Sequence, residues 1–267
     1  MKTLTIIPSR LSATRLPGKP LLKIKGLSII SHVFNIAKEA NIGDVIVATE
    51  DQEIVDDVVQ NGGKAILTSK KHKTGTDRIY EALQKLQIKD LDFIMNLQGD
   101  EPAINVEDIV NLNKKMIANN SNLGTLASKI QNVKDLVNEN IVKVITKKKI
   151  GKDQFSEAKT FLRSSSKIDN IYHHIGIYCY STKTLERFVK LNQSKNEIKN
   201  RLEQLRALDN NININVALAE SSSVGVDTEE DYLALKKKKW NIKLNEQNLF
   251  SRCFWGIFTS CSAICFS

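Results

Sequence analysis

The stretch TLTIIPSRLSATRLPGKP, residues 3–20, decides the fold because it joins a strand-like apolar run to a stiff loop. Its opening residues are rich in β-branched side chains and are apolar on both faces, which is typical of buried strands in parallel sheets. Pro8, Pro17 and Pro20, three of the four prolines in the chain, restrict the backbone that follows. Gly18 permits a positive φ between them. We therefore expect a first buried strand that ends in a loop of restricted shape.

Strand signals recur along the first half of the chain, with helical periods between them. Strands are expected at 3–8, 44–49, 64–68 and 92–97. Apolar side chains at helical spacing follow Ser28, Thr76 and Asn105, which are candidate N-caps. Alternating strands and helices favour right-handed βαβ units. The predicted fold is therefore of the α/β class, with a doubly wound, mostly parallel sheet flanked by helices.

The second half keeps this alternation but is less regular. Strands are expected at 122–130, 141–146, 174–181 and 213–220, and helices near 182–191, 197–209 and 229–239. Residues 147–172 have no clear period and are interpreted as a long excursion. We predict one domain over residues 1–240 with a small inserted lobe at about 122–215, followed by an atypical tail over 241–267.

Composition argues against several classes of protein. The net charge of +9 comes mostly from lysines spread along the 267 residues, which indicates solvated faces rather than a nucleic-acid patch. The chain has no run of 18 apolar residues that would predict a spanning helix, and its first residues do not resemble a signal peptide. We therefore expect a cytoplasmic protein that binds no nucleic acid and has no stable membrane span.

The four cysteines do not form a CxxC pair and are too clustered for a disulfide framework. Cys179 lies in an apolar, strand-like run and is predicted to be a core thiol. The other three fall in the stretch LFSRCFWGIFTSCSAICFS, residues 249–267, which Arg252 interrupts. This stretch is not expected to span a membrane or to hold a metal.

Three cations, Arg10, Arg15 and Lys19, lie in the loop after the first strand. In open α/β sheets the ligand site lies beyond the carboxyl ends of the strands. Arginine offers forked hydrogen bonds to phosphate, and lysine offers a compact charge. We expect these side chains to converge on an anion, although a surface loop with incidental cations is the alternative.

Carboxylates follow two further strands. Asp100 lies in QGDEP, residues 98–102, at the end of the strand over 92–97. Asp227 precedes Thr228, which with Asp231 resembles a capping box and leaves the Asp227 carboxylate outside the helix. Such a pair could hold Mg²⁺, which takes oxygen ligands and often shares them with substrate phosphates. The alternative for Asp100 is that it caps the next helix.

The stretch HKTGTDRIYEAL, residues 72–83, begins a helix near Gly75 and Thr76. The first N–H groups of that helix could bind a base edge or a phosphate. Arg78 falls in the first turn, where a cation is unfavourable unless a ligand or a carboxylate such as Asp77 offsets its charge.

Taken together, these segments resemble one family. PSRLSATRLPGKPL, HKTGTDRI, NLQGDEP and GVDTEEDY, in this order and spacing, are similar to the 3-deoxy-manno-octulosonate (Kdo) cytidylyltransferases, from residue 4 to about 240. The resemblance implies a Rossmann-like nucleotidyltransferase that uses Mg²⁺ to convert CTP and Kdo into CMP-Kdo and pyrophosphate for lipopolysaccharide biosynthesis. It also implies a homodimer, with the lobe over 122–215 on the sugar side and at the dimer contact.

The resemblance assigns roles residue by residue. Catalytic roles fall to Lys19, Arg15, Asp100 and Asp227, of which Asp100 and Asp227 are the metal ligands. Nucleotide contacts fall to Ser9, Arg10, Arg15, Lys19, Gly75 and Arg78. Sugar contacts fall to Gln98, Arg163, His174, Tyr178, Glu203 and Gln204.

Two positions depart from the family pattern. Residues 161–166 read FLRSSS, without the Ile-Pro that usually precedes the next strand, so Arg163 stands in for the sugar-contacting arginine. Glu50 replaces a common aspartate. A modified Kdo or a nonulosonic acid is therefore the alternative acceptor. A non-catalytic nucleotide- or nucleic-acid-binding protein is the alternative class, and it would not need Asp100 and Asp227.

Overall fold

The computed structural model describes residues 1–12, 15–166, 169–220 and 225–237. The predicted tail at 241–267 lies outside these residues. Residues Met1–Lys236 form one compact unit, and the lobe predicted over 122–215 lies within it. No helix in the described ranges is long and apolar enough to cross a membrane.

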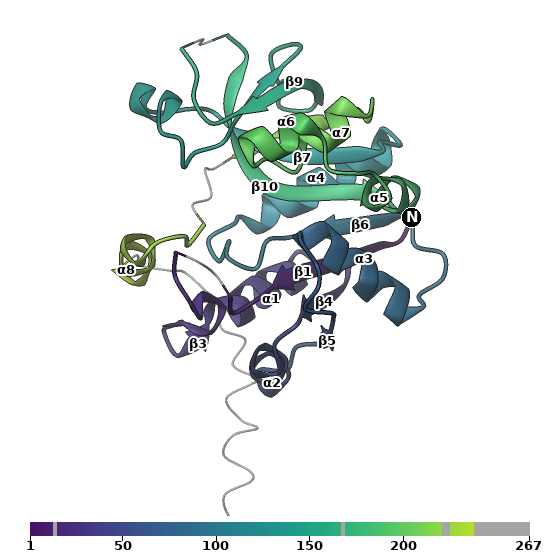
Figure 1. Ribbon diagram of the computed structural model, residues 1–267, viewed down its shortest axis with the longest axis vertical. Helices are drawn as coiled ribbons and strands as arrows, with labels where there is room; N and C mark the ends of the chain where they lie inside the picture. The colour runs from purple at the N-terminus through teal and green to yellow at the C-terminus, as the bar shows by residue number, and fades with distance from the viewer. Residues whose placement is uncertain (13–14, 167–168, 221–224, 238–267) are drawn as a thin grey trace, which may run out of the picture. The chain divides into compact units, whose positions relative to one another are not determined.

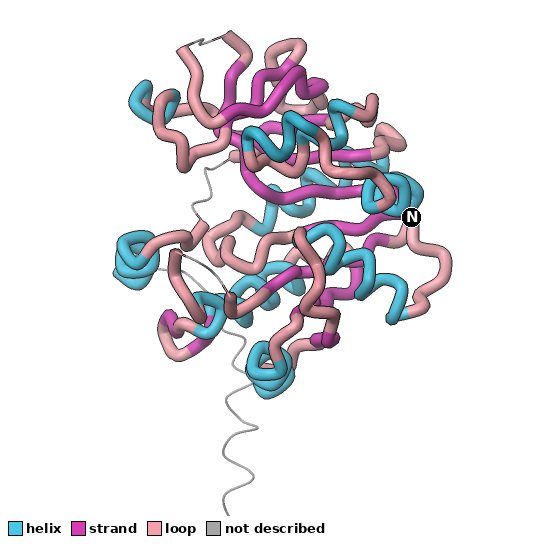
Figure 2. Tube along the Cα trace, in the orientation of Figure 1, coloured by secondary structure: helices cyan, strands magenta, loops and turns pink. Residues whose placement is uncertain are grey.

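The described residues build a nine-stranded sheet in the order β5-β4-β1-β6-β10-β7-β11-β9-β8, with an added pairing between β10 and β8 (Figures 1 and 2). The strands are β1 Thr3–Ser9, β4 Gly43–Thr49, β5 Ala65–Leu67, β6 Phe93–Asn96, β7 Leu123–Ser128, β8 Lys143–Thr146, β9 Ser156–Leu162, β10 Ile171–Ser181 and β11 Asn215–Leu218. A separate short hairpin pairs β2 Lys23–Ile24 with β3 Leu27–Ser28.

The helices are α1 Ile29–Glu39, α2 Gln52–Gln60, α3 Gly75–Leu86, α4 Val106–Ala118, α5 Thr182–Val189, α6 Lys195–Asn200, α7 Leu205–Asp209 and α8 Glu229–Lys237. Two 3₁₀ turns, η1 Lys19–Leu21 and η2 Val133–Leu136, complete the elements. The α/β class predicted from the sequence is confirmed.

Strand direction divides the sheet into two parts. β5, β4, β1 and β6 run parallel, as the buried apolar runs predicted. β10 runs antiparallel to both β6 and β7, so β6 and β7 point the same way, and β11 runs parallel to β7. The carboxyl ends of β1, β6, β7 and β11 therefore face one edge of the sheet, where a ligand site is expected.

Two apolar layers cover the two faces of the sheet. One contains Ile79 of α3, Leu185 of α5 and Leu205 of α7. The other contains Val33 of α1 and residues of α2 and α4. Neighbouring residues of β1 alternate between these layers, because successive side chains of a strand point to opposite faces. This two-sided burial holds the strand ends in fixed relative positions.

Predicted helix starts were correct at two positions and displaced at a third. The side chains of Ser28 and Asn105 cap α1 and α4. α3 begins after Thr74, whose hydroxyl accepts from the Asp77 N–H, so the cap predicted at Thr76 is wrong by two residues. Thr76 is a helix residue whose hydroxyl makes a tertiary contact.

Three elements differ from the predicted pattern. The region 147–172 contains β9, so it is only partly an excursion. The helix predicted over 197–209 is two helices, α6 and α7, because Arg201 adopts a left-handed conformation with φ of 54°. α2 was not predicted. Cys179 is fully buried, as expected of a core thiol.

Candidate active site

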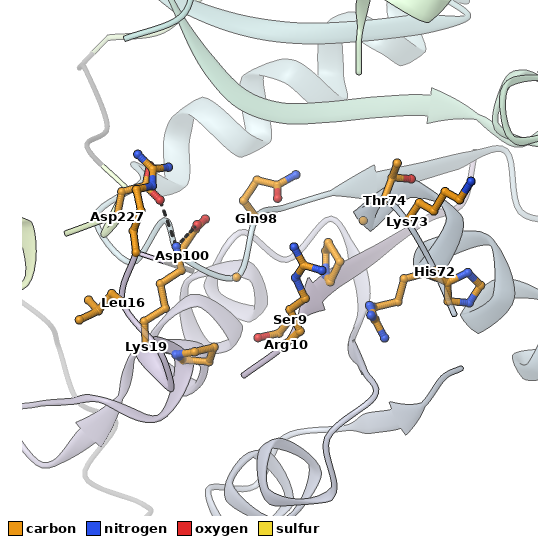
Figure 3. A pocket seen from close by; sticks show the side chains of 16 residues that line it. Ser9, Arg10, Leu16, Lys19, His72, Lys73, Thr74, Gln98, Asp100 and Asp227 are labelled. Carbon is orange, nitrogen blue, oxygen red and sulfur yellow. Dashed lines mark hydrogen bonds and ion pairs between the residues drawn. The ribbon is translucent and has the colours of Figure 1, made fainter. Parts of the chain in front are cut away.

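A pocket of about 360 Å³ lies at the carboxyl ends of β1 and β6, beside the start of α3 (Figure 3). It brings together the catalytic and nucleotide-binding residues predicted from the sequence, and Gln98. These residues are Ser9, Arg10, Arg15, Lys19, Gly75, Arg78, Gln98, Asp100 and Asp227. They come from four separate segments of the chain, so the fold, and not local sequence, makes the site.

Lys19 lies at the centre of the charged end of the pocket. Its Nζ donates to Asp100 Oδ2 at 2.6 Å, to the Val226 carbonyl at 2.9 Å and to Asp227 Oδ1 at 3.2 Å. These three acceptors use all three N–H bonds of the ammonium. Burial alone would lower the pKa of Lys19, but the charges of Asp100 and Asp227 outweigh it and raise that pKa. The lysine is therefore held as a cation between the two carboxylates.

The second carboxylate is fixed by the helix that follows it. Asp231 accepts from the N–H groups of Asp227 and Thr228, and Thr228 Oγ1 accepts from the Asp231 N–H. This reciprocal pattern is the capping box predicted from the sequence, with Asp in place of Glu. The Asp227 side chain remains outside the helix and accepts from Arg15 Nη2 at 2.8 Å.

Backbone contacts join the loops that carry the two aspartates. The Val226 N–H donates to the Asp100 carbonyl at 2.8 Å. Gly99 lies so close to β1 that a Cβ there would be 2.9 Å from the Pro8 carbonyl oxygen. A side chain at this position would push the Asp100 loop away from the end of β1. Gly18, with φ of 70°, begins the η1 turn that carries Lys19, as the sequence predicted.

Arg78 is buried at the other end of the pocket, near the start of α3. Its Nη2 donates to Glu50, and its Nη1 donates to Thr68 Oγ1 at 2.6 Å. Glu50 is therefore a carboxylate that offsets this cation near a helix N-terminus, a role that sequence reasoning assigned to Asp77. Nothing in the sequence near Arg78 indicates Glu50, because the pair lies 28 residues apart.

Ser9 and Gln98 lie between the two ends. Ser9 is buried, and its Oγ has no hydrogen-bond partner within the described part of the chain. A buried hydroxyl without a partner is costly, so a ligand that bonded to it would recover that cost. Gln98 Nε2 donates to Asn96 Oδ1 at 3.1 Å, which orients the amide above the pocket.

The other predicted sugar contacts do not line this pocket. His174 and Tyr178 belong to β10 and are buried, with ring centroids 5.5 Å apart. His174 Nε2 lies 3.0 Å from Thr125 Oγ1. Burial, and to a smaller extent the charge of His173, lowers the pKa of His174 to about 3. Both side chains are therefore neutral at ordinary pH.

Glu203 links the sugar-side residues to α3. Its Oε2 accepts from Thr76 Oγ1 at 3.0 Å, next to the pocket residue Gly75. Burial raises the pKa of Glu203, although Arg206, with Nη2 at 3.7 Å from Oε1, favours the charged form. Gln204 is buried at the N-cap position of α7. Thus the sugar-side cluster adjoins the pocket through α3 without opening into it.

Arg163 is held by backbone groups. Its guanidinium donates to the carbonyls of Asn200, Glu139 and Arg201 at 3.0, 3.0 and 3.1 Å. These contacts join β9 to the loop before β8 and to the end of α6. The sugar contact assigned to Arg163 stays a prediction, since the contacts described for it are structural.

Comparison with known proteins identifies the family of this chain. The family model described as Cytidylyltransferase matches residues 4–214. The 3-deoxy-manno-octulosonate cytidylyltransferase of Thermodesulfovibrio yellowstonii is 44% identical over 249 residues, which cover 89% of this chain and 98% of the relative. The chain belongs to the 3-deoxy-manno-octulosonate cytidylyltransferase family. The Rhodopseudomonas palustris (strain BisB5) member is 41% identical over 86% of this chain and 94% of its own.

Solved structures place this cytidylyltransferase in the same fold. A CMP:2-keto-3-deoxy-manno-octonic acid synthetase complexed with CTP has a TM-score of 0.80 and 34% identity, and the match covers 88% of this chain and 97% of that one. A cytidylyltransferase from Leptospira borgpetersenii, at 18% identity and a TM-score of 0.57, shares the fold. The family resemblance inferred from four short motifs is confirmed.

Proposed function

We propose that the chain transfers CMP from CTP to Kdo and releases pyrophosphate, and that the product feeds lipopolysaccharide biosynthesis. The observation that carries this proposal is the convergence of Lys19, Arg15, Asp100 and Asp227 in one pocket. Relatives of more than 40% identity over most of the chain bear the name of this activity. A non-catalytic nucleotide-binding protein would have no use for the paired carboxylates.

The cationic loop and the start of α3 would hold the nucleotide. Arg10 and Arg15 present guanidinium forks, which suit phosphate oxygens. The partnerless Ser9 hydroxyl would bond to the bound nucleotide, and Gly75 lets the ligand approach the backbone of the helix start.

Asp100 and Asp227 would hold Mg²⁺. The two carboxylates and the Val226 carbonyl already surround one cation, the Lys19 ammonium, and an all-oxygen donor set suits Mg²⁺. Mg²⁺ often takes only one or two carboxylates from the protein and completes its coordination with substrate phosphates and water. When bound, Mg²⁺ would polarise a phosphoryl oxygen and favour ionisation of the attacking hydroxyl.

Lys19 has to change partners during the reaction. Its three N–H bonds are all used by Asp100, Val226 and Asp227, so contact with a phosphate requires the release of at least one of them. In the transfer, the anomeric hydroxyl of Kdo gives up its proton to solvent, its oxygen bonds to the α-phosphorus, and the bond from that phosphorus to the bridging oxygen breaks to release pyrophosphate. Lys19 and Arg15 would stabilise the negative charge that collects on the departing pyrophosphate.

The sugar would lie between the nucleotide and the cluster on β10 and α7. We propose that Gln98, His174, Tyr178, Glu203 and Gln204 contact it, since Thr76 ties Glu203 to the helix that borders the pocket. Neutral His174 and Tyr178 offer hydrogen bonds to sugar hydroxyls without bringing charge into the core. A modified Kdo or a nonulosonic acid is a second candidate acceptor, because backbone carbonyls engage Arg163.

Two further properties belong to this proposal. The resemblance implies a homodimer built through the lobe over 122–215. A cytoplasmic location would give the enzyme access to CTP.

Release of pyrophosphate from CTP, measured with and without Kdo and with and without Mg²⁺, tests the proposed function. We expect release only when both are present. Release with a nonulosonic acid but not with Kdo would select the second acceptor. The absence of release with any acid sugar would refute the transferase activity.

A further inference from the structure

The end of the pocket that lies away from the carboxylates contains an oriented histidine. His72, Lys73 and Thr74 line this end, and Lys19, Asp100 and Asp227 line the other (Figure 3). Because the triphosphate is assigned to the charged end, the base of a bound nucleotide would lie beside His72. This inference thus rests on the proposed function, since it takes CTP as the ligand of the pocket.

Glu81 of α3 holds one nitrogen of the His72 ring. His72 Nε2 is in hydrogen-bond contact with Glu81 Oε2. The Glu81 carboxylate also accepts from the Ser69 N–H at 2.9 and 3.1 Å, and it pairs with Lys85 Nζ at 2.7 Å. Although burial opposes it, hydrogen bonds from Lys85, Ser69 and His72 lower the pKa of Glu81 to about 2. The carboxylate stays an acceptor at any assay pH, so Nε2 carries a hydrogen.

A ring that donates through Nε2 can accept through Nδ1 when it is neutral. Among the described residues, Nδ1 of His72 has no hydrogen-bond partner. The other side chains at this end are poor acceptors: Lys73 and Arg78 are cations, and the Thr74 hydroxyl accepts from the Asp77 N–H at 3.2 Å. His72 is therefore the side chain best able to accept a hydrogen bond from the ligand here.

We propose that His72, oriented by Glu81, selects cytosine over uracil by accepting a hydrogen bond from the exocyclic 4-amino group through Nδ1. Uracil carries a carbonyl oxygen at this position, which would face the Nδ1 lone pair and repel it. His72 is thus a specificity-determining residue, and Glu81 is its positioning residue. Binding of CTP loses little side-chain entropy at His72, because the contact with Glu81 fixes the ring before the ligand binds.

Equilibrium binding by the full chain tests this inference without any sugar. The dissociation constants of CTP, UTP and 2-pyrimidinone riboside triphosphate, which lacks the 4-amino group, are measured by calorimetry for wild type and His72→Phe. We expect wild type to prefer CTP over both analogues by roughly ten- to a hundredfold, and His72→Phe to lose most of that preference. Phe keeps a flat ring but removes both the Nδ1 acceptor and the Nε2 donor to Glu81, so the comparison of the three nucleotides, and not the loss of affinity alone, reports the acceptor.

Comparing three nucleotides in two proteins distinguishes recognition of the base by His72 from a purely structural role of His72 in its loop. If His72 only braces the loop, His72→Phe weakens binding of all three nucleotides by one common factor, and the inference fails. It also fails if wild type binds UTP or the 2-pyrimidinone as tightly as CTP. Selective CTP binding that depends on His72, together with no pyrophosphate release from CTP and Kdo, would instead refute only the proposed function.

Two further variants test the inference even if His72→Phe does not fold. Glu81→Gln can both donate to and accept from the ring, so we expect a smaller but measurable loss of the CTP preference. An unchanged preference would remove Glu81 from the inference. Lys64→Met is the control, because Lys64 pairs with Asp44 on an exposed surface and does not line the pocket. It should retain the wild-type preference.

Discussion

The nucleotide side and the sugar side of the site are built differently. Lys19, Asp100, Asp227 and Arg15 expose 13, 33, 43 and 55% of their side chains, and their charges are paired with one another. His174 is buried in the core beside the ring of Phe161, with centroids 5.1 Å apart. One side is a set of exchangeable ion pairs at the ends of strands. The other side is part of the hydrophobic packing.

This difference indicates that the two sides recognise their ligands by different physics. Partly exposed ion pairs are weak in themselves, so their partners can be exchanged for phosphate and metal at small cost. Buried neutral groups keep one geometry and discriminate by shape and hydrogen bonding, because an unmatched polar group there is expensive. We therefore expect substitutions on the nucleotide side to reduce activity and those on the sugar side to reduce stability as well.

Asp100→Asn should give the largest effect. The variant removes one of two charges proposed to bind Mg²⁺, so turnover should fall by roughly a thousandfold or more, with the fold intact. Pyrophosphate release and thermal unfolding measure the two effects. Asp44→Asn is the control, because Asp44 pairs with Lys64 on an exposed surface away from the pocket. Near-normal turnover in Asp100→Asn would remove Asp100 from the mechanism.

Lys19→Met should act in opposite directions on two ligands. Loss of the ammonium should reduce kcat/KM for CTP by roughly a hundredfold. It should also strengthen binding of Mg²⁺ to the protein without nucleotide, since the metal no longer competes with a lysine for the two carboxylates. Calorimetry with Mg²⁺ checks this second effect, with Lys64→Met as the control. An effect limited to the KM of the sugar would contradict the assignment of Lys19.

His174 should make stability depend on pH. Its pKa is about 3 in the folded protein, against an ordinary value of 6.5, so the unfolded chain binds a proton more readily between these values. The part of the free energy of unfolding that depends on neutral His174 is fully present above pH 6.5, and it is lost as pH falls towards 3. Between pH 7 and pH 5 the loss should be about 2 kcal/mol. His174→Gln should not show this loss of about 2 kcal/mol, and urea unfolding of both proteins at pH 7 and pH 5 measures it. Equal losses in wild type and variant would contradict the role given to His174.

Arg163→Lys should have the smallest effect. Lysine cannot reproduce the planar fork that contacts three carbonyls, so we expect a loss of about 1 kcal/mol in the free energy of unfolding. Arg187→Lys, where the arginine donates to one carbonyl, should lose less. The KM for CTP should not change in either. A large rise in the KM for the sugar in Arg163→Lys would show that Arg163 contacts the sugar and does not only stabilise the fold.

The sequence predicted the nucleotide side well because each of its parts is local. The strand over 3–8, Gly18, the cap at Ser28 and the capping box after Asp227 all follow from short-range rules of conformation. Parallel strands then bring their carboxyl ends to one edge, so the charged loops had to be neighbours.

The sugar side and the buried contact between Glu50 and Arg78 depend on packing between distant segments, which local patterns do not encode. Glu50 and Arg78 meet through the folding of β4 against α3, and no periodicity predicts that pair. β9 was missed because its alternation is interrupted by polar residues at an antiparallel part of the sheet. The sugar contacts were assigned by family resemblance, and the structure brings Glu203, but not Arg163, to α3.

We propose that Lys19 and Asp227, 208 residues apart, act on one bound nucleotide. A double-mutant cycle measures it directly: CTP binding in the presence of Mg²⁺ is determined by calorimetry for wild type, Lys19→Met, Asp227→Asn and the double variant. We expect the two losses of binding free energy to be non-additive, with a coupling of at least about 1 kcal/mol. Losses that add to within about 0.3 kcal/mol would mean that the two side chains act independently and would refute their joint action on the nucleotide.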